Sequence, residues 1–111
     1  KTLEDVQAMI GHMVGVAMES QENPKEIYKI GLNTSRLLMA TGDLIIAWLL
    51  LRQADIAQNK LATAGKDTEF YNGKIASAKF FIRSVLPHIS VERAVVESET
   101  GEIMNIAESA F

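Results

Sequence analysis

The sequence predicts an all-α fold: an antiparallel four-helix bundle with a long central helix and a third helix that is kinked at a proline. Apolar residues recur at three- and four-residue spacing over four stretches of the chain, which is the period of an amphipathic helix. The 111 residues include only two prolines, and the alternation of β-branched and polar residues that marks strands is absent. A chain of this length has room for one modest core, so residues 1–111 are predicted to form a single helical domain.

The first predicted helix begins at Thr2, whose hydroxyl can cap the free N–H groups of the first turn. Glu4 and Asp5 follow, where the helix dipole favours acidic side chains. Asn23 and Pro24 are expected to end this helix and to open the next one, because proline suits a first helical turn. The apolar stripe of the first helix consists of Leu3, Val6, Ile10, Met13 and Ala17.

The second predicted helix is long, from about Lys25 to about Thr63, and carries two apolar stripes. A helix that is apolar on nearly every side is surrounded by neighbours, so we expect it at the centre of the bundle. Gly31 and Gly42 either bend this helix or let another backbone approach closely, and Gly65 is expected to end it. One stripe consists of Ile30, Leu37, Leu44, Trp48 and Leu51, and the other of Leu38, Ile45, Leu49 and Ile56.

The third predicted helix covers about residues 67–98, with Asp67 or Thr68 as its cap. Pro87 lies inside this pattern, and because its ring clashes with the preceding turn, we expect a kink near Arg83. Four antiparallel helices with short connections form a bundle, which buries all of their apolar stripes. The fourth helix is expected to be short and to contain Ile103, Ile106 and Ala107.

Composition and charge exclude several classes of partner and chemistry. The formal net charge is −3, and because binding to phosphates takes a basic surface, no nucleic-acid partner is expected. The chain has no cysteine, which excludes a disulfide framework and a thiol nucleophile and fits a cytoplasmic location. The most apolar run, Leu44–Leu51, is too short to span a bilayer, so no transmembrane segment is predicted. Because the chain starts at Lys1 rather than Met, we interpret it as an excised domain or a processed product.

No catalytic constellation and no metal site is predicted. Di-iron bundles use a Glu-x-x-His motif, and neither His12 nor His88 follows a glutamate by three residues. His12 has no adjacent lysine, so a partly buried or interface histidine is favoured over a phosphotransfer histidine. No glycine-rich phosphate loop follows a strand, and no Ser–His–acid arrangement is indicated by spacing.

Two polar features of the second helix stand out. Asp43 shares a face with apolar neighbours, which fits an N-cap after a break at Gly42, an edge position facing water, or a polar contact to another domain. Trp48 is predicted to anchor the core, with Arg52 lying along its ring and pairing with Asp55. The five methionines are interpreted as adaptable packing or as docking surface.

The order and spacing of four motifs resemble a known family. The motifs are Trp48-Leu-Leu-Leu-Arg52-Gln-Ala54, Lys74-Ile-Ala-Ser-Ala78-Lys-Phe-Phe81, Leu86-Pro87 and the terminal Phe111. In these features the chain resembles the C-terminal helical domain of the longer acyl-CoA dehydrogenases (the acetyl-CoA dehydrogenase C-terminal-like domain), bacterial fatty-acyl enzymes among them. The resemblance covers residues 27–111, and residues 1–26 are similar to the preceding helix of the same domain.

The resemblance implies a fragment from the C-terminal end of a larger flavoenzyme, an FAD-dependent oxidoreductase of fatty acid metabolism. In that family a glutamate removes the α-proton of an acyl-CoA thioester while a hydride passes from the β-carbon to FAD. The glutamate and the flavin pocket belong to the larger preceding portion, so this chain is expected to hold no catalytic residue and no cofactor by itself. The implied partners are the catalytic portion of the same polypeptide and further subunits of a homo-oligomer.

Lys74, Lys79 and Arg83 are the candidate docking residues, or contacts to cofactor phosphates, because they make the third segment basic. The alternative function is a free-standing helical protein–protein interaction module. Such a module would use its methionine and isoleucine faces to bind a partner or a second copy of itself.

Overall fold

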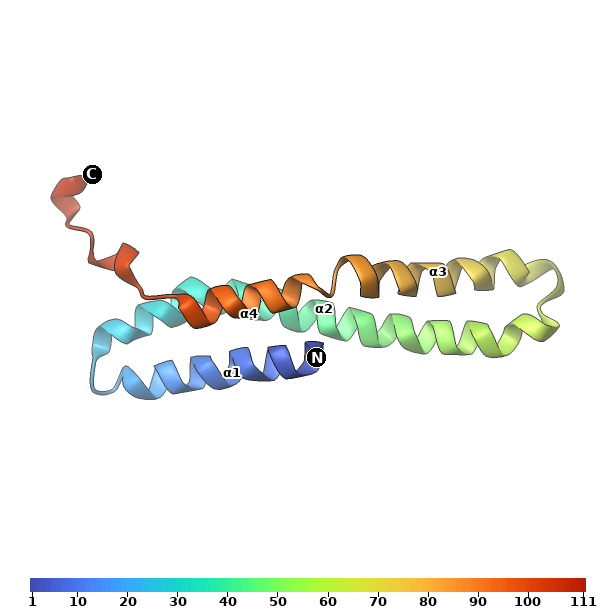
Figure 1. Ribbon diagram of the computed structural model, residues 1–111, viewed down its shortest axis with the longest axis horizontal. Helices are drawn as coiled ribbons and strands as arrows, with labels where there is room; N and C mark the ends of the chain where they lie inside the picture. Colours follow the sequence, from blue (N-terminus) through green and yellow to red (C-terminus); the bar gives the residue numbers. More distant parts are fainter.

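A computed structural model describes all 111 residues, which form helices and turns without a strand. The four α-helices are α1 (Thr2–Glu19), α2 (Ile27–Lys60), α3 (Thr68–Ser84) and α4 (His88–Ser98). α2 runs along the length of the molecule, with α1 beside its first half and α3 beside its second half (Figure 1). α4 returns along the first half of α2 and packs against α1. The predicted all-α class is confirmed.

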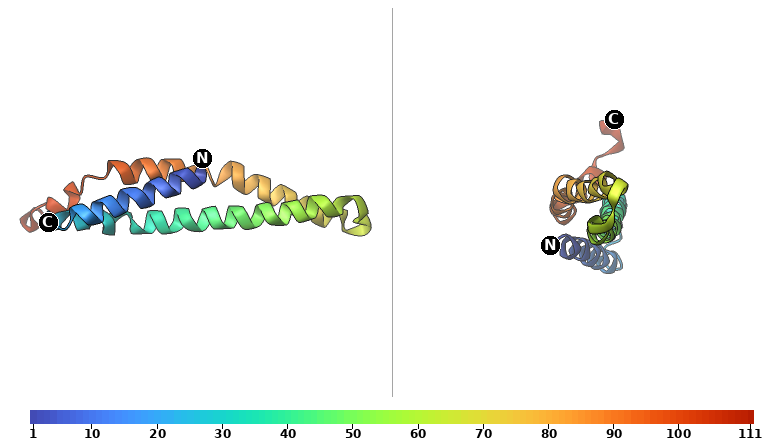
Figure 2. Two further views of the ribbon diagram at one scale, coloured as in Figure 1. Left: turned by 90° about the horizontal axis from the view of Figure 1, so that it is seen from below. Right: turned by 90° about the vertical axis from the view of Figure 1, so that its right-hand side faces the viewer.

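The helices form an elongated arrangement. The molecule measures 68 × 30 × 15 Å, and α1, α3 and α4 share one side of α2 (left view of Figure 2). The segment that was expected to be the fourth helix forms only two 3-10 turns, Glu102–Asn105 and Glu108–Ala110. These turns project from the end of the molecule (Figure 1). The antiparallel four-helix bundle is therefore not confirmed.

Pro87 separates two helices. Proline has no backbone N–H, and its ring clashes with the carbonyl four residues before it, so a regular α-helix does not pass through it. α3 and α4 lie on either side of residues 85–87. The first two N–H groups after α3 both donate to the carbonyl of Phe81, at 2.9 and 3.2 Å. The expected kink near Arg83 is not confirmed, because the structure has two helices where the sequence predicted one.

Some of the helix boundaries fall where the sequence predicted them, and one does not. Asn23 is extended and Pro24 begins the 3-10 turn that leads into α2, as predicted. Gly65 has a φ of 53°, which glycine adopts readily, and it follows the helical run of α2 as expected. Thr2, in contrast, lies inside α1: the N-cap position falls on Lys1, and no side chain caps this helix.

The core lies where α1, α2 and α4 meet. Against α3, the second half of α2 buries only small side chains, and the buried residue of α3 is itself an alanine, Ala78. Small residues at a contact let two helices approach closely but bury little apolar area. The buried core residues are Val6, Met9, Ala40, Ile89 and Val96, and half-buried Met13, Leu37, Leu44 and Leu86 pack against them.

The chain leaves much of its surface exposed. Its accessible surface is 7888 Å², whereas a compact monomer of 12.2 kDa exposes about 6,100 Å². Its radius of gyration is 20.0 Å, against about 13 Å for a compact domain of this length. Only 12 of its 111 residues are buried. The chain by itself therefore does not cover its own apolar residues.

Ile89→Val should lower the free energy of unfolding of the chain by about 1 kcal/mol, because it removes a methylene group from the core. Ile89 is 1% exposed. Val91→Ala, on the same helix, is the matched control: Val91 is 61% exposed, and its truncation should change stability by less than about 0.5 kcal/mol. Urea denaturation followed by circular dichroism measures both, and equal losses would contradict the location of the core.

Candidate functional site

The side of α2 that faces away from the other helices is apolar. On its inner side Ala40 and Ala47 are buried. An exposed apolar stripe of α2 lies about half a turn round the helix from these two alanines. The left view of Figure 2 shows the outer side of α2 bare. The second stripe predicted from the sequence thus has no partner within this chain. We call it the outer stripe; its members are Leu38, Ile45, Leu49 and Ile56, which are 70, 51, 46 and 53% exposed.

Gly42 lies within the outer stripe, one turn from Leu38 and from Ile45. α2 is unbroken across this position. A Cβ atom added at Gly42 or at Gly31 would meet nothing within 4 Å, so no other part of this chain packs on these glycines. Gly42 therefore forms an open notch in the backbone between larger apolar side chains.

A second apolar surface joins the outer stripe near the start of α1. Trp48 is 55% exposed there, beside the start of α1, so the prediction that it anchors the core is wrong. Arg52 lies over the ring of Trp48, 5.2 Å from the centroid, as predicted, but it forms no ion pair with Asp55. The residues that line this hollow of about 280 Å³ are all apolar: Leu3, Leu44, Ile45 and Trp48.

A polar hollow of about 260 Å³ lies between α2 and α4. Arg36 and Glu92 form an ion pair across it, with 2.6 Å between Nη1 and Oε2. Asp43 and His88 also line it, and Asp43 is half-buried. Because α2 continues through this region, the N-cap explanation for Asp43 is wrong. An edge position and a contact to another domain remain as explanations.

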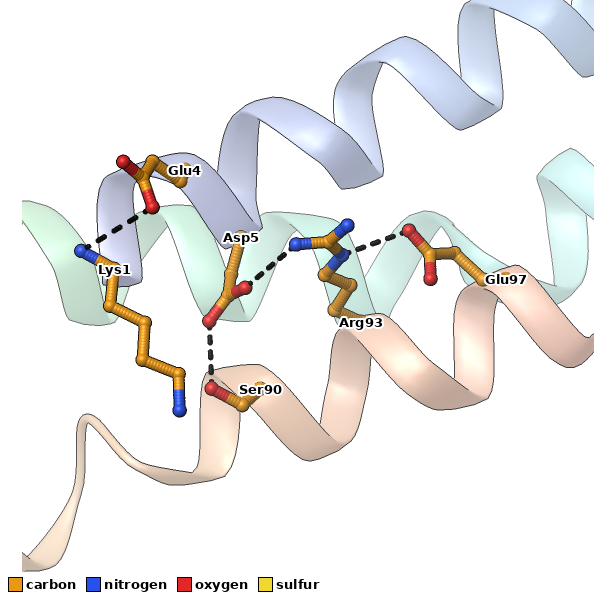
Figure 3. A network of polar contacts seen from close by, with 6 residues as sticks. All are labelled: Lys1, Glu4, Asp5, Ser90, Arg93 and Glu97. Carbon is orange, nitrogen blue, oxygen red and sulfur yellow. Dashed lines mark hydrogen bonds and ion pairs between the residues drawn. The ribbon is translucent and has the colours of Figure 1, made fainter.

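A group of four polar residues fastens α1 to α4 (Figure 3). The carboxylate of Asp5 accepts hydrogen bonds from Ser90 Oγ at 2.7 Å and from Arg93 Nη1 at 3.0 Å. Arg93 Nε also donates to Glu97 at 2.8 Å, so one guanidinium bridges two carboxylates. Asp5 is 5% exposed although it is ionisable. We call these four residues the α1–α4 clamp.

These contacts shift the pKa values of the clamp residues. Hydrogen bonds from Ser90 and then from Arg93 lower the pKa of Asp5, and they outweigh burial, which acts in the opposite direction. Hydrogen bonds to Glu97 and then to Asp5 raise the pKa of Arg93. At the start of α2, Glu26 likewise raises the pKa of Lys29 by accepting a bond of 2.6 Å. Asp5, Arg93 and Lys29, the three groups with shifted pKa values, are each held in an ion pair. This arrangement is typical of residues that stabilise a fold.

Lys74, Lys79 and Arg83 lie on α3 but do not form one patch. At about 100° per residue, Lys79 and Arg83 are one turn apart, whereas Lys74 lies about 140° round the helix from Lys79. Lys74 Nζ lies over the ring of Phe70, 5.3 Å from its centroid. These residues alone do not form a cradle for a flavin or a nucleotide phosphate. Their role in docking or in phosphate contacts stays a prediction.

The histidines and methionines are spread over the molecule. His12 is half-buried on α1, and His88 is exposed at the start of α4. No three potential metal ligands lie close enough together to hold an ion. Met9 is part of the core and Met13 packs against it. The exposed methionines are Met18, Met39 and Met104.

α2 is long and apolar enough to cross a bilayer, judged by length and composition. The helical run Pro24–Thr63 has an 18-residue window with a mean hydropathy of 1.4, and 11% of that window is buried in this chain. The run Leu44–Leu51, on which the prediction of no transmembrane segment rests, is a shorter part of this helix. A core helix of a soluble assembly has the same length and composition, so the absence of a transmembrane segment stays a prediction.

Comparison with known proteins decides the family. The model of the family described as acetyl-CoA dehydrogenase C-terminal like matches residues 1–107. The chain belongs to this family. Over its whole length it is 42% identical to the broad-specificity linear acyl-CoA dehydrogenase FadE5 of Mycobacterium tuberculosis. Two butyryl-CoA dehydrogenases of Syntrophomonas wolfei are 36% and 37% identical over 74% and 65% of the chain. The resemblance stated from the sequence is confirmed.

The acetyl-CoA dehydrogenase C-terminal-like chain spans a small part of these relatives. The match takes up 18% of FadE5 and 14% and 12% of the two butyryl-CoA dehydrogenases. In FadE5 it falls in the C-terminal region. More than four-fifths of each relative therefore lies outside the matched segment.

Sequence reasoning missed the α1–α4 clamp. It interpreted Asp5 only as an acid in the first turn of a helix. A signal was nevertheless present, because Asp5 lies one turn before Met9 and so shares the inner face of α1 with the core. A buried acid on such a face requires a cation or hydroxyl donors. The sequence does not tell which helix supplies them.

Acid should weaken the clamp. The pKa of Asp5 is lower in the folded chain than in the unfolded chain, where it is about 3.9. The stabilisation is therefore fully present above that pH and is lost as pH falls through the folded-state value. Asp5→Asn should be less stable than wild type at pH 7, and the difference should shrink below about pH 4. Urea denaturation between pH 7 and pH 3 measures it.

Glu4→Gln is the matched control for this experiment. Its carboxylate lies next to Asp5 in sequence but is 81% exposed, and its nearest cation is the terminal amine at 3.9 Å. Removing its charge should leave the pH dependence of stability unchanged. A difference between wild type and Asp5→Asn that stays constant across this pH range would contradict the clamp.

Proposed function

We propose that this chain is the C-terminal helical domain of an FAD-dependent acyl-CoA dehydrogenase and that it supports the enzyme without supplying catalytic residues. The observation that carries the proposal is the family match over residues 1–107 in a chain whose long apolar helix is uncovered. The identity of 42% to FadE5 over the whole chain supports it. A domain of this kind buries its bare surface against the rest of the polypeptide.

The parent reaction is the α,β-dehydrogenation of acyl-CoA thioesters, for which bound FAD supplies the hydride acceptor. The residues of this chain act on that reaction only by packing. The core and the α1–α4 clamp hold α1 and α4 on α2. α2 in turn presents the outer stripe and Trp48 to the rest of the enzyme. Completion of the flavin region is thus an indirect effect of this domain.

The exposed apolar surface supports a role in assembly. The chain exposes roughly 1,800 Å² more total surface, polar and apolar together, than a compact monomer of its mass, and a standard interface buries about 800 Å² per partner. The excess is sufficient for one contact with the catalytic portion and a second with a neighbouring subunit. We propose that the parent is a homo-oligomer. Its cysteine-free domain fits the reducing cytoplasm.

The second candidate function is a free-standing interaction module, and the exposed isoleucine and methionine residues favour it equally. The two candidates differ in what the gene encodes before the codon of Lys1. An in-frame acyl-CoA dehydrogenase body with its glutamate base supports the first candidate, and a start codon directly upstream supports the second. Sequencing that DNA is the experiment that separates them.

Deleting residues 1–111 from the polypeptide that carries them should lower its melting temperature and alter its oligomer size or flavin content. The value of kcat per bound flavin should stay close to that of the intact enzyme, because this domain supplies packing. Deletion of residues 102–111 alone is the control, since these exposed turns project from the fold. Loss of kcat with full flavin content and unchanged oligomer size would contradict the proposal.

Replacing Lys74, Lys79 and Arg83 by glutamate in the complete enzyme should weaken flavin retention or assembly, because three positive charges become negative. Flavin absorbance and light scattering measure the two outcomes. The matched control makes the same change of charge at exposed lysines outside α3, namely Lys25, Lys60 and Lys66. Unchanged flavin content and oligomer size, or an equal effect in the control, would exclude a specific role for the three residues.

A further inference from the structure

We infer that the outer stripe of α2 is the seam on which an apolar helix from the preceding part of the same polypeptide docks, crossing α2 at Gly42. This inference rests on the proposed function and adds the face, the crossing point and the chemistry of the partner. It concerns the side of α2 that is bare in the left view of Figure 2. The three other helices lie on the opposite side of α2 in the same view.

The shape of the outer stripe fits a helix. From Leu38 to Ile56 the stripe runs along about 27 Å of α2, at 1.5 Å per residue. Gly42 lies between larger side chains, and a Cβ there would meet nothing within 4 Å. Helices pack with their axes about 8–10 Å apart, and the shorter distances require small residues at the crossing. The notch at Gly42 is therefore the place where a second backbone comes closest.

The charges of α2 specify an apolar partner. Around Gly42, between Leu37 and Leu51, the helix carries a single charged residue, Asp43. The next one, Arg52, lies toward the end of the stripe, one turn from Leu49 and from Ile56, with its guanidinium over the ring of Trp48. Asp43 lines the hollow toward α4 and so lies away from the outer stripe. A charged or strongly polar partner would lose hydration on the part of the stripe around Gly42 without gaining a counterion or a hydrogen bond there. An apolar helix face has no charged or polar groups that would lose hydration there.

The length of the relatives points to the same polypeptide as the source of this helix. More than four-fifths of FadE5 lies outside the matched segment, and the match falls in its C-terminal region. A segment tethered in this way has an effective concentration of the order of millimolar. A separate copy of the chain would compete with this tethered helix for the outer stripe, and its concentration would be lower.

The test compares the effect of Gly42→Leu on the stability of the 111-residue chain with its effect on the attachment of the domain in the full polypeptide. In the 111-residue chain Gly42→Leu should leave the urea midpoint unchanged or raise it, because the site is open and leucine favours the helix over glycine. In the full polypeptide the same substitution should fill the notch and raise the rate of proteolytic release of the domain at least tenfold. The matched control is Gly73→Leu on α3, which is also open. It should leave that rate within twofold of wild type.

Two outcomes separate this inference from the proposed function. If the wild-type domain melts in a transition of its own, at the temperature of the 111-residue chain, the proposed function fails. If the domain melts together with the rest of the enzyme and Gly42→Leu releases it no faster than Gly73→Leu, the outer stripe is not the seam and only this inference fails.

Two other occupants of the outer stripe give distinct results, and either one would overturn the inference. A second copy would make the 111-residue chain a dimer in light scattering, with Gly42→Leu restoring the monomer and leaving the full polypeptide unaffected. A lipid surface would make the chain sediment with phosphatidylcholine vesicles, with Leu49→Lys abolishing sedimentation in the chain and in the full polypeptide. A monomer that stays free of vesicles supports the inference.

Discussion

The small side chains along the inner side of α2 determine how the other helices are arranged. Ala40, Ala47 and Ala57 are each at most 3% exposed. Because an alanine projects only a methyl group, neighbouring helices can come close to α2 on this side. Three helices therefore share one side of a single long helix, where Leu37 and Leu44 also pack against the core, and the apolar residues of the outer stripe are left on the other side. The elongated shape and the large exposed surface both follow from this arrangement.

The two halves of α2 hold their neighbours in different ways. α3 follows α2 after a short connection, residues 61–67, so their contact is local in sequence. α1 and α4 lie far apart in sequence and meet through the core and through the clamp, in which Asp5 and Arg93 are 88 positions apart. The break at Pro87 ends α3 and lets α4 start as a separate helix, which reaches the first half of α2. The clamp thus closes the fold at the point where the entropy cost of closure is greatest.

The uncovered side of α2 connects the structure with the family. An apolar helix face that stays exposed over several turns is an interaction surface. The relatives that contain this domain are several times longer, so they contain the additional chain that can cover such a surface. α2 also resembles a membrane-spanning helix in length and composition. Apolar residues that serve a protein interface and those that face lipid have the same hydropathy, and only the partner distinguishes them.

The class of the fold, the family, the start of the second helical run at Pro24, the role of Gly65 and the stacking of Arg52 on Trp48 could all be predicted from the sequence. Each of these depends on residues close together in the chain or on their order. Periodicity also identified both stripes of α2. It did not tell which stripe the chain would cover, because the spacing of apolar residues shows that a helix has a face but not what packs on it.

The tertiary structure decided what depends on contacts between distant segments. It left Trp48 and the outer stripe exposed, joined Asp5 to Arg93, excluded an N-cap role for Asp43, and divided the third predicted helix at Pro87. The physical reason is that a proline breaks hydrogen bonds in either a kink or a full interruption, and the packing of the following segment selects between them. In the same way, a carboxylate on the inner face of a helix indicates that some donor must pair with it, but only the folded chain shows that the donor of Asp5 is Arg93.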